Sequence, residues 1–203
     1  MGKKNKKNKE KKSSSGPSKL EKKLQKVEED IRSGRKKMIK ILSKMGTIDE
    51  LNDYELVDWN GNPIKLSAMF GNKNDLILVH NMGKSCSYCT LWADGYNGTQ
   101  YFIEKTASFA VVSPDPPDVQ KEFALSRGWK FKMYSGIGST LIKDMGFETE
   151  KGEYWPGVSV FHKDENGKIT RVAKDYFGPG DFYCSVFHFL DLIPKNGKEG
   201  ASE

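Results

Sequence analysis

Two continuous apolar runs constrain the fold of this chain more than any other feature: DLILVHN at residues 75–81 and SFAVVS at residues 108–113. Unbroken apolar runs of this length are typical of strands buried on both faces, as in sheets covered by helices. A third pattern, at residues 158–177, indicates two strands joined by a turn at Asn166-Gly167. Because helical segments alternate with these strands, we predict an α/β fold with a central mixed sheet flanked by helices.

Turn and cap signals predict the shorter elements. The segment LSAMFG predicts one helical turn closed by Gly71, after a turn at residues 60–63. In DPPDVQKEFALSRG, Asp115 is a candidate N-cap, Pro116 the candidate first helical residue and Gly128 the residue that ends the helix. Together these signals predict short helices between the strands.

The charge of the chain is unevenly distributed. Residues 1–12 carry seven lysines and one acid, and residues 13–48 carry ten basic and four acidic groups, whereas residues 49–203 are net negative. A lysine-rich arm can bind RNA, an anionic membrane or an acidic partner. The first 48 residues contain no aromatic side chain on which bases could stack. We therefore expect a solvated, disordered tail, with nucleic-acid contact as the less favoured alternative.

Apolar residues recur at three- and four-residue steps after the SSSGPS linker, which predicts an amphipathic helix. An interruption is predicted at the SGR tripeptide of residues 33–35. The pattern also fits a coiled-coil seam, but its breaks favour docking of the helix onto the domain. The residues of this stripe are Leu20, Leu24, Val27, Ile31, Met38, Ile41, Leu42 and Met45.

Hydropathy and cysteine usage predict the compartment. No apolar segment approaches the roughly 18 residues of a spanning helix, and no apolar region follows the N-terminal lysines as in a signal peptide. We therefore expect a cytoplasmic protein without membrane contact, in which thiols are mostly reduced. Of its three cysteines, Cys86 and Cys89 form a CxxC pair, which in this setting indicates catalysis or metal binding rather than a structural disulfide.

The position of the CxxC pair favours thiol chemistry. Cys86 follows a buried strand and a short loop, so we predict it at the start of a helix. Unpaired backbone N–H groups there stabilise a thiolate, the form that attacks disulfides or peroxides, and Lys84 adds a cation. Cys89 follows one helical turn later and is predicted to be more buried. Cys86 is thus the candidate nucleophile and Cys89 the candidate resolving thiol.

Other readings of these residues stay open. A structural zinc site needs about four ligands, and the chain has no second CxxC, although Cys184 and His188 lie four residues apart. The cysteines could also be small residues packed in a core. Cys184 is predicted to be a core residue of a final amphipathic helix, GDFYCSVFHFLDLIP. His80 is a candidate base, but a hydrogen-bonded core histidine is favoured. No metal or cofactor is predicted.

Trp155 and Pro156, in EYWPGVSVF, form a second candidate feature of the site. A cis bond between them would present the backbone of Trp155 to a bound chain. An ordinary trans proline that opens a strand is favoured, because cis X–Pro bonds are rare. Both residues are candidate substrate contacts.

The segment CSYCTLWADGYNG closely resembles the signature of an uncharacterised bacterial family, a domain of unknown function in the thioredoxin-like superfamily near the alkyl hydroperoxide reductase/thiol-specific antioxidant branch. GNPIKLSAMFGNKNDLILVHNM is similar to the lead-in of peroxiredoxin-like domains, and the resemblance covers residues 50–195. It implies a thioredoxin-like fold, with Pro156 at the superfamily's cis-proline position facing the CxxC pair. Asp94, within the signature, is a hypothetical proton relay to the buried thiol.

The predicted division of the chain follows from composition and from this resemblance. It consists of a disordered lysine-rich tail and linker, an amphipathic helical segment, a thioredoxin-like domain and a disordered C-terminus, at residues 1–18, 19–48, 49–197 and 198–203.

These features predict a thiol–disulfide oxidoreductase whose partners are a protein or small-molecule disulfide and an unidentified thiol reductant. The alternative implied by the resemblance is a peroxiredoxin-like thiol peroxidase. Peroxiredoxins carry a proline seven residues and a threonine three residues before the peroxidatic cysteine, where this chain has Val79 and Gly83 before Cys86. A peroxide-polarising arginine has only Arg127 and Arg171 as candidates. A non-enzymatic binding module on the same fold is the third reading.

Overall fold

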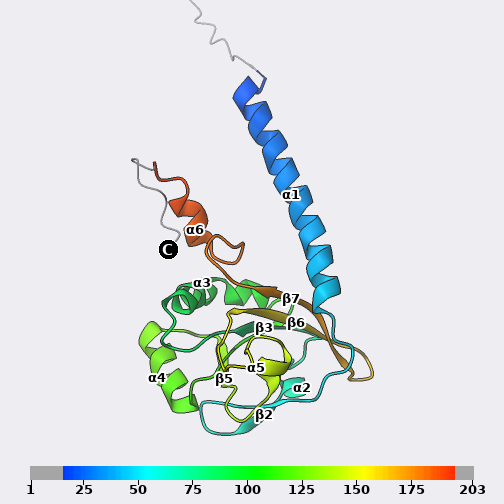
Figure 1. Ribbon diagram of the computed structural model, residues 1–203, viewed down its shortest axis with the longest axis vertical. Helices are drawn as coiled ribbons and strands as arrows, with labels where there is room; N and C mark the ends of the chain where they lie inside the picture. Colours follow the sequence, from blue (N-terminus) through cyan, green and yellow to red (C-terminus); the bar gives the residue numbers. More distant parts are fainter. Residues whose placement is uncertain (1–15, 195–203) are drawn as a thin grey trace, which may run out of the picture. The chain divides into compact units, whose positions relative to one another are not determined.

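The described part of the chain, residues 16–194 of 203 in a computed structural model, is built around one mixed sheet of seven strands (Figure 1). The strand order is β2-β1-β5-β4-β3-β6-β7. The central strands β5, β4 and β3 are parallel, and all other neighbours pair antiparallel. This arrangement confirms the predicted fold class. The strands are β1 Glu55–Val57, β2 Pro63–Lys65, β3 Asp75–His80, β4 Ser108–Ser113, β5 Lys132–Ser135, β6 Gly157–Lys163 and β7 Ile169–Tyr176.

The two apolar runs of the sequence form β3 and β4 at the centre of the sheet. In β3, Leu78 pairs with Ala110 of β4 on one side and with Ser159 of β6 on the other. Successive side chains of a strand point to opposite faces, so the neighbours Leu78 and Val79 belong to different core clusters. Both faces of these strands are therefore covered.

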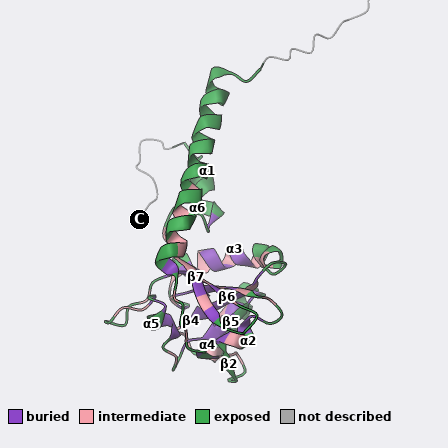
Figure 2. Cartoon of the chain, turned by 90° about the vertical axis from the view of Figure 1, so that its right-hand side faces the viewer, coloured by how far each residue is buried: buried purple, intermediate pink, exposed green. Residues whose placement is uncertain are grey.

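Helices bury both faces of the sheet, whose side chains are largely buried in Figure 2. One core cluster contains side chains of α2 and α5 and, fully buried, Phe70 and Phe147. The cluster on the other face contains side chains of α3 and α4, Trp92 among them, and Trp129, which follows α4. The helices are α1 Lys19–Gly46, α2 Leu66–Met69, α3 Ser87–Ile103, α4 Pro117–Arg127, α5 Leu141–Asp144 and α6 Ser185–Leu190.

The predicted glycine signals are confirmed, but one predicted cap is wrong. Gly71 and Gly128 follow α2 and α4 with φ of 54° and 68°, a region that glycine enters without steric cost. Asp115 does not cap α4, because Pro117 takes the first helical position and Pro116 becomes the N-cap residue. The Asp115 carboxylate is instead directed at the loop that precedes α3.

Helix α1 runs unbroken over Lys19–Gly46, so the interruption predicted at residues 33–35 is wrong. A single glycine in a helix interior costs only about 1 kcal/mol, and good helix formers surround it here. The helix begins with a capping box in which the Glu21 N–H donates to the Ser18 hydroxyl, at 3.2 Å, and the Ser18 N–H donates to the Glu21 carboxylate. The boundary between the two compact units of the chain falls after Lys40, within this helix.

Parts of the predicted division lie outside the described residues, namely residues 1–15 of the tail and the C-terminal segment 198–203. The predicted final helix is shorter than expected, since α6 covers only Ser185–Leu190. No helix of residues 16–194 combines the length and the apolar character needed to cross a membrane.

The hairpin of β6 and β7 forms as predicted and brings the backbone very close to Gly157. This residue pairs with His80 on one side and with Tyr176 on the other. A Cβ atom at Gly157 would lie 2.3 Å from the Asp175 carbonyl oxygen and 2.4 Å from the Phe147 ring. A side chain at this position therefore cannot be accommodated without movement of the backbone.

Gly157→Ala is predicted to lower the free energy of unfolding by about 1–3 kcal/mol, the usual cost of overpacking a tight core. The matched control is Gly178→Ala, because a Cβ atom there meets nothing within 4 Å. Urea unfolding of both variants measures the difference. Equal stability of the two variants would contradict the close approach at Gly157.

Candidate functional site

The short loop between β3 and α3 is fixed by hydrogen bonds. The Asn81 side-chain oxygen accepts from the Gly83 N–H at 2.8 Å, and the Lys84 N–H donates to the Asp115 carboxylate at 2.8 Å. Gly83 has a φ of +102°, and a Cβ atom there would lie 2.8 Å from Asp115. Glycine thus allows the loop to pass close to Asp115, which fixes where α3 begins.

Cys86 is the N-cap residue of α3 and has an extended backbone, with φ −87° and ψ 105°. Its sulfur accepts a hydrogen bond from the Cys89 N–H at 3.1 Å, the bond that a serine or aspartate oxygen usually makes at this position. The Cys86 carbonyl accepts from the N–H and the hydroxyl of Thr90, each at 3.1 Å. The side chain is partly exposed. The helix N-terminus therefore stabilises negative charge on a sulfur that a substrate can reach.

Cys89 lies one turn into α3, where its side chain is only 3% exposed. Burial raises the pKa of the Cys89 thiol far above its usual range, and the hydrogen bond to Cys86 and the charge on that sulfur raise it further. The Met82 N–H, 3.5 Å from the Cys89 sulfur, lowers the pKa and so offsets part of this rise. At neutral pH Cys89 thus keeps its proton.

Pro156 lies beside the buried thiol. It lines a small internal gap together with Cys89 and Trp92. The Trp155–Pro156 bond is trans, like every other peptide bond of residues 16–194, so the cis bond that the resemblance suggests is not present. The Trp155 N–H pairs with the Phe147 carbonyl at 2.9 Å, which sets the path of the chain here, and the Trp155 side chain is 55% exposed.

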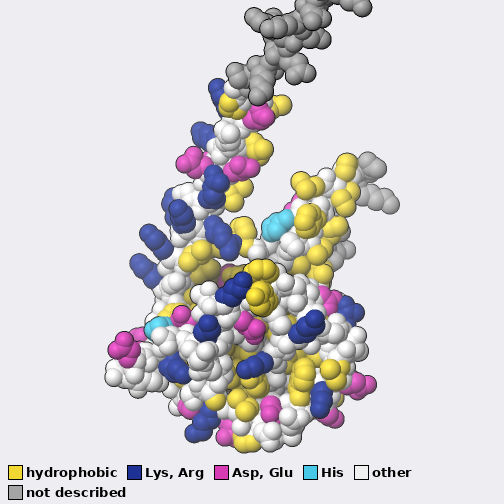
Figure 3. Space-filling model, turned by 180° about the vertical axis from the view of Figure 1, so that it is seen from behind, with side chains coloured by type: hydrophobic (Ala, Val, Ile, Leu, Met, Phe, Trp, Pro, Cys, Tyr) yellow, Lys and Arg dark blue, Asp and Glu magenta, His cyan; other side chains and the backbone are white. Residues whose placement is uncertain are grey.

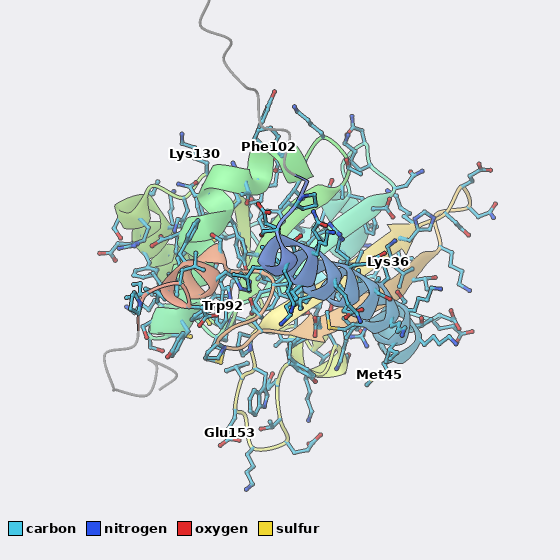
Figure 4. The ribbon with its side chains drawn as sticks, turned by 90° about the horizontal axis from the view of Figure 1, so that it is seen from above. Lys36, Met45, Trp92, Phe102, Lys130 and Glu153 are labelled. Carbon is cyan, nitrogen blue, oxygen red and sulfur yellow. The ribbon has the colours of Figure 1, made fainter. Side chains whose placement is uncertain are left out.

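Trp92, labelled in Figure 4, ties the CxxC helix to the C-terminal segment. Its ring packs against Phe177, and its indole N–H donates to the Asp181 carboxylate at 3.4 Å. The same carboxylate accepts from the N–H of Cys184 at 3.1 Å. Cys184 is buried as predicted, but it precedes α6 rather than lying within it. All three cysteines are free thiols.

His80 is buried and hydrogen-bonded, as the sequence favours. Its ring is 1% exposed, stacks on Phe147 at 3.9 Å and lies 2.9 Å from the Ser159 hydroxyl through Nε2. Burial lowers the pKa of His80 well below its usual value, and the charges of Arg171 and Lys174 lower it further. The ring is therefore neutral.

Asp94 and the two candidate arginines bind other groups. The Asp94 carboxylate accepts hydrogen bonds from Arg127 and, at 2.8 Å, from the Trp129 indole. Burial alone would raise the pKa of Asp94, but these partners outweigh it and lower the pKa. Arg171 is buried and donates to the carbonyls of Gly46 and Met145. The proton relay proposed for Asp94 thus has no support in this geometry, and neither arginine is held for a peroxide.

The geometry also bears on the zinc alternative. Within residues 16–194, no group of three or more His, Cys, Asp or Glu side chains is arranged to hold a metal ion.

Sequence reasoning missed the residues that support the pair. Asn81, Asp115 and Asp181 all position the backbone around it. Asp115 could have been found, because β3 and β4 are parallel neighbours whose carboxyl ends meet at one edge of the sheet. Asp181 could not, since nothing local predicts that the C-terminal segment returns to α3.

Comparison with known proteins agrees with this fold. The model of a family described as "Bacterial protein of unknown function (DUF899)" matches residues 17–202, and no protein with a curated description matches the sequence. The peroxidoxin BcpB of Mycobacterium tuberculosis has a TM-score of 0.52 and 25% identity, over 64% of this chain and 85% of that chain. Reduced Prx3 of Vibrio vulnificus in complex with hydrogen peroxide has a TM-score of 0.54 and 16% identity, over 70% and 96%. A PrxQ cysteine-to-serine mutant of Xylella fastidiosa has a TM-score of 0.55 and 17% identity, over 70% and 93%. The fold is thus the thioredoxin-like fold of peroxiredoxins.

Iodoacetamide is predicted to alkylate Cys86 first in the reduced, folded protein at neutral pH. Cys89 and Cys184 should stay unmodified because they are buried, and Cys89 is also protonated. In a Cys86→Ser variant, Cys89 should react only as the pH rises well above the ordinary thiol pKa of about 8.5. Peptide mass spectrometry measures both, with denatured protein as the control. Faster modification of Cys89 than of Cys86 at neutral pH would contradict this account.

Asp115→Ala is predicted to slow alkylation of Cys86 by about threefold or more, since the loop before α3 loses a charge-assisted hydrogen bond. Asp118→Ala, which removes a carboxylate from the first turn of α4, is the matched control. Alkylation rates of the two variants are compared with that of the unmodified sequence. Equal rates of Cys86 alkylation in Asp115→Ala and Asp118→Ala would contradict the proposed role of Asp115 in fixing this loop.

Proposed function

The chain belongs to the bacterial family of unknown function whose model covers residues 17–202, and within it we propose that this protein is a thiol–disulfide oxidoreductase acting through Cys86 and Cys89. One observation carries the proposal: the Cys86 sulfur accepts the Cys89 amide at the start of α3, while the buried Cys89 thiol keeps its proton. The pair thus offers an accessible nucleophile and a second thiol that reacts after it.

In the first step, the Cys86 thiolate attacks one sulfur of a substrate disulfide. A mixed disulfide forms, the substrate S–S bond breaks, and the leaving thiolate takes a proton from water. In the second step, Cys89 gives up its proton and its thiolate attacks the Cys86 sulfur. The Cys86–Cys89 disulfide forms, and the second substrate sulfur leaves as a thiol. The substrate gains two electrons, and the protein loses two.

Burial of Cys89 determines the order in which the two thiols react. Cys89 holds its proton while Cys86 is free, because burial and the negative charge of Cys86 both disfavour a second thiolate. Once Cys86 is bonded to substrate, that charge is gone, so the pKa of Cys89 falls towards what burial alone imposes. A thiol reductant must then reduce the pair, and the same steps in reverse would oxidise a substrate dithiol.

Two exposed aromatic side chains favour a protein or other extended disulfide as substrate. Tyr88, in the first turn of α3, and Trp155, beside Pro156, keep 36% and 55% of their side chains exposed. Exposed aromatic side chains give apolar contact area at little cost in conformational entropy. Trp155 and Pro156 are thus the proposed substrate contacts, in a cytoplasmic protein whose thiols a reducing compartment would maintain.

A thiol peroxidase is the second candidate, favoured by the similarity to structures named as peroxiredoxins. In that reaction the Cys86 thiolate attacks a peroxide oxygen and becomes a sulfenic acid, which Cys89 then converts to the disulfide with loss of water. The residues around Cys86 offer less help with oxygen–oxygen cleavage, because Arg127 and Arg171 are bound elsewhere. A non-enzymatic binding module on the same fold is the third candidate.

Glutathione disulfide, as a probe, is predicted to leave a persistent adduct on Cys86 in a Cys89→Ser variant. In the unmodified sequence Cys89 should expel the adduct and form the Cys86–Cys89 disulfide. Cys184→Ser is the matched control and should behave like the unmodified sequence. Intact-mass spectrometry of quenched reactions distinguishes the species. An equally persistent adduct with and without Cys89 would contradict the resolving role of Cys89. A rate of hydrogen peroxide consumption higher than the rate of disulfide reduction would favour the peroxidase.

A further inference from the structure

Helix α1 carries an apolar stripe whose residues are exposed except for Met38, which is half-buried. Figure 3 shows hydrophobic side chains along one side of this helix and lysines and arginines along the other. Leu20 is 76% exposed and Ile31 is 54% exposed. Isolated exposed apolar residues are ordinary, but a continuous exposed stripe on a long helix indicates a binding surface. We call this stripe the α1 seam, consisting of Leu20, Leu24, Val27, Ile31, Met38, Ile41 and Met45.

The α1 seam has the spacing of a coiled coil. Its members alternate steps of four and three residues, so they fill the a and d positions of a heptad repeat. The one position of this series without an apolar side chain is Gly34, a d position. The continuous helix keeps the repeat in register through Gly34, which the interruption expected from the sequence would have broken. Four successive heptads of such spacing are typical of two-stranded association rather than of a globular core.

The charges beside the seam favour two parallel copies in register. In that arrangement a residue at g faces the residue five positions later, at e, on the other helix. Lys23 then faces Glu28 of the second copy, and Asp30 faces Arg35 of the second copy. Two opposite-charge pairs form, and symmetry doubles each. Full antiparallel overlap would also form two opposite-charge pairs, Asp30 with Lys37 and Glu28 with Arg35. Only that arrangement adds a like-charge contact, Lys23 with Lys44 of the second copy, so the charges favour the parallel one.

We propose that α1 is a dimerisation helix, which forms a parallel, in-register two-stranded coiled coil with α1 of a second copy of this chain. The seam supplies the apolar interface, and the charges at e and g set its direction. The proposal concerns assembly and does not depend on the redox chemistry of the CxxC pair.

The first test compares two isoleucines of the same helix. Ile31→Lys puts a charge at an a position in both chains, whereas Ile39→Lys makes the same change at a b position, outside the seam, where the side chain is 48% exposed. Sedimentation equilibrium of the full chain under reducing conditions should show a dimer for the unmodified sequence and for Ile39→Lys. Ile31→Lys should weaken dimerisation by about tenfold or more. A monomeric unmodified chain, or equal effects of the two variants, would overturn the proposal.

Two further variants test its geometry. Lys23→Glu should weaken the dimer by about threefold or more, since in parallel helices it places a new carboxylate against Glu28 of the other copy. In antiparallel helices the same change would strengthen the dimer, by removing the Lys23–Lys44 repulsion. Lys22→Glu, at an outward-facing f position, is the control with the same change in charge. Gly34→Leu should tighten the dimer by filling the empty d layer. Strengthening by Lys23→Glu would overturn the parallel arrangement.

Discussion

The hydrogen bond from the Cys89 amide to the Cys86 sulfur starts α3, and it forms where the central strand β3 emerges from the sheet. Burial on both faces fixes that strand, and the hydrogen bonds of Asn81 and Asp115 fix the loop that follows it. A sulfur in the N-cap position thus depends on the packing of the whole domain. An isolated CxxC segment would have the same thiols but not the helix end that stabilises one of them.

The two thiols differ in reactivity because Cys89 is more deeply buried than Cys86. Cys86 lies at the helix end with partial access to solvent, and Cys89 lies one turn lower, against Pro156 and Trp92. The helix N-terminus favours charge at the first position, and low polarity disfavours it at the second. The hydrogen bond from the Trp92 indole to the Asp181 carboxylate connects α3 to the C-terminal segment. The proposed order, attack by Cys86 and then release by Cys89, follows from this difference between their surroundings.

The sequence alone was sufficient for the features that depend on local chemistry. Strands β3 and β4, the helix at the CxxC pair and the ends at Gly71 and Gly128 were predictable from apolar runs and from glycine. The cap at Asp115 was mispredicted because two consecutive prolines compete for the first helical turn, and tertiary contact decides where the carboxylate points. The break in α1 was overestimated because one glycine costs less than the rest of a long helix supplies. The trans bond before Pro156 agrees with the rarity of cis bonds, which favoured it from the sequence. The return of Asp181 to Trp92 depends on contacts distant in sequence, which spacing does not show.

The central claim is that Cys86 and Cys89 form a reversible two-electron couple. Equilibrating the protein across a dithiothreitol gradient, alkylating the free thiols and counting adducts by mass tests it directly. The account predicts a single transition in which two thiols disappear together, mapped to Cys86 and Cys89, while Cys184 stays free. A midpoint within the cytosolic poise of about −220 to −320 mV would let the pair exchange electrons with cellular thiols. Three thiols that stay free at every potential would contradict the account.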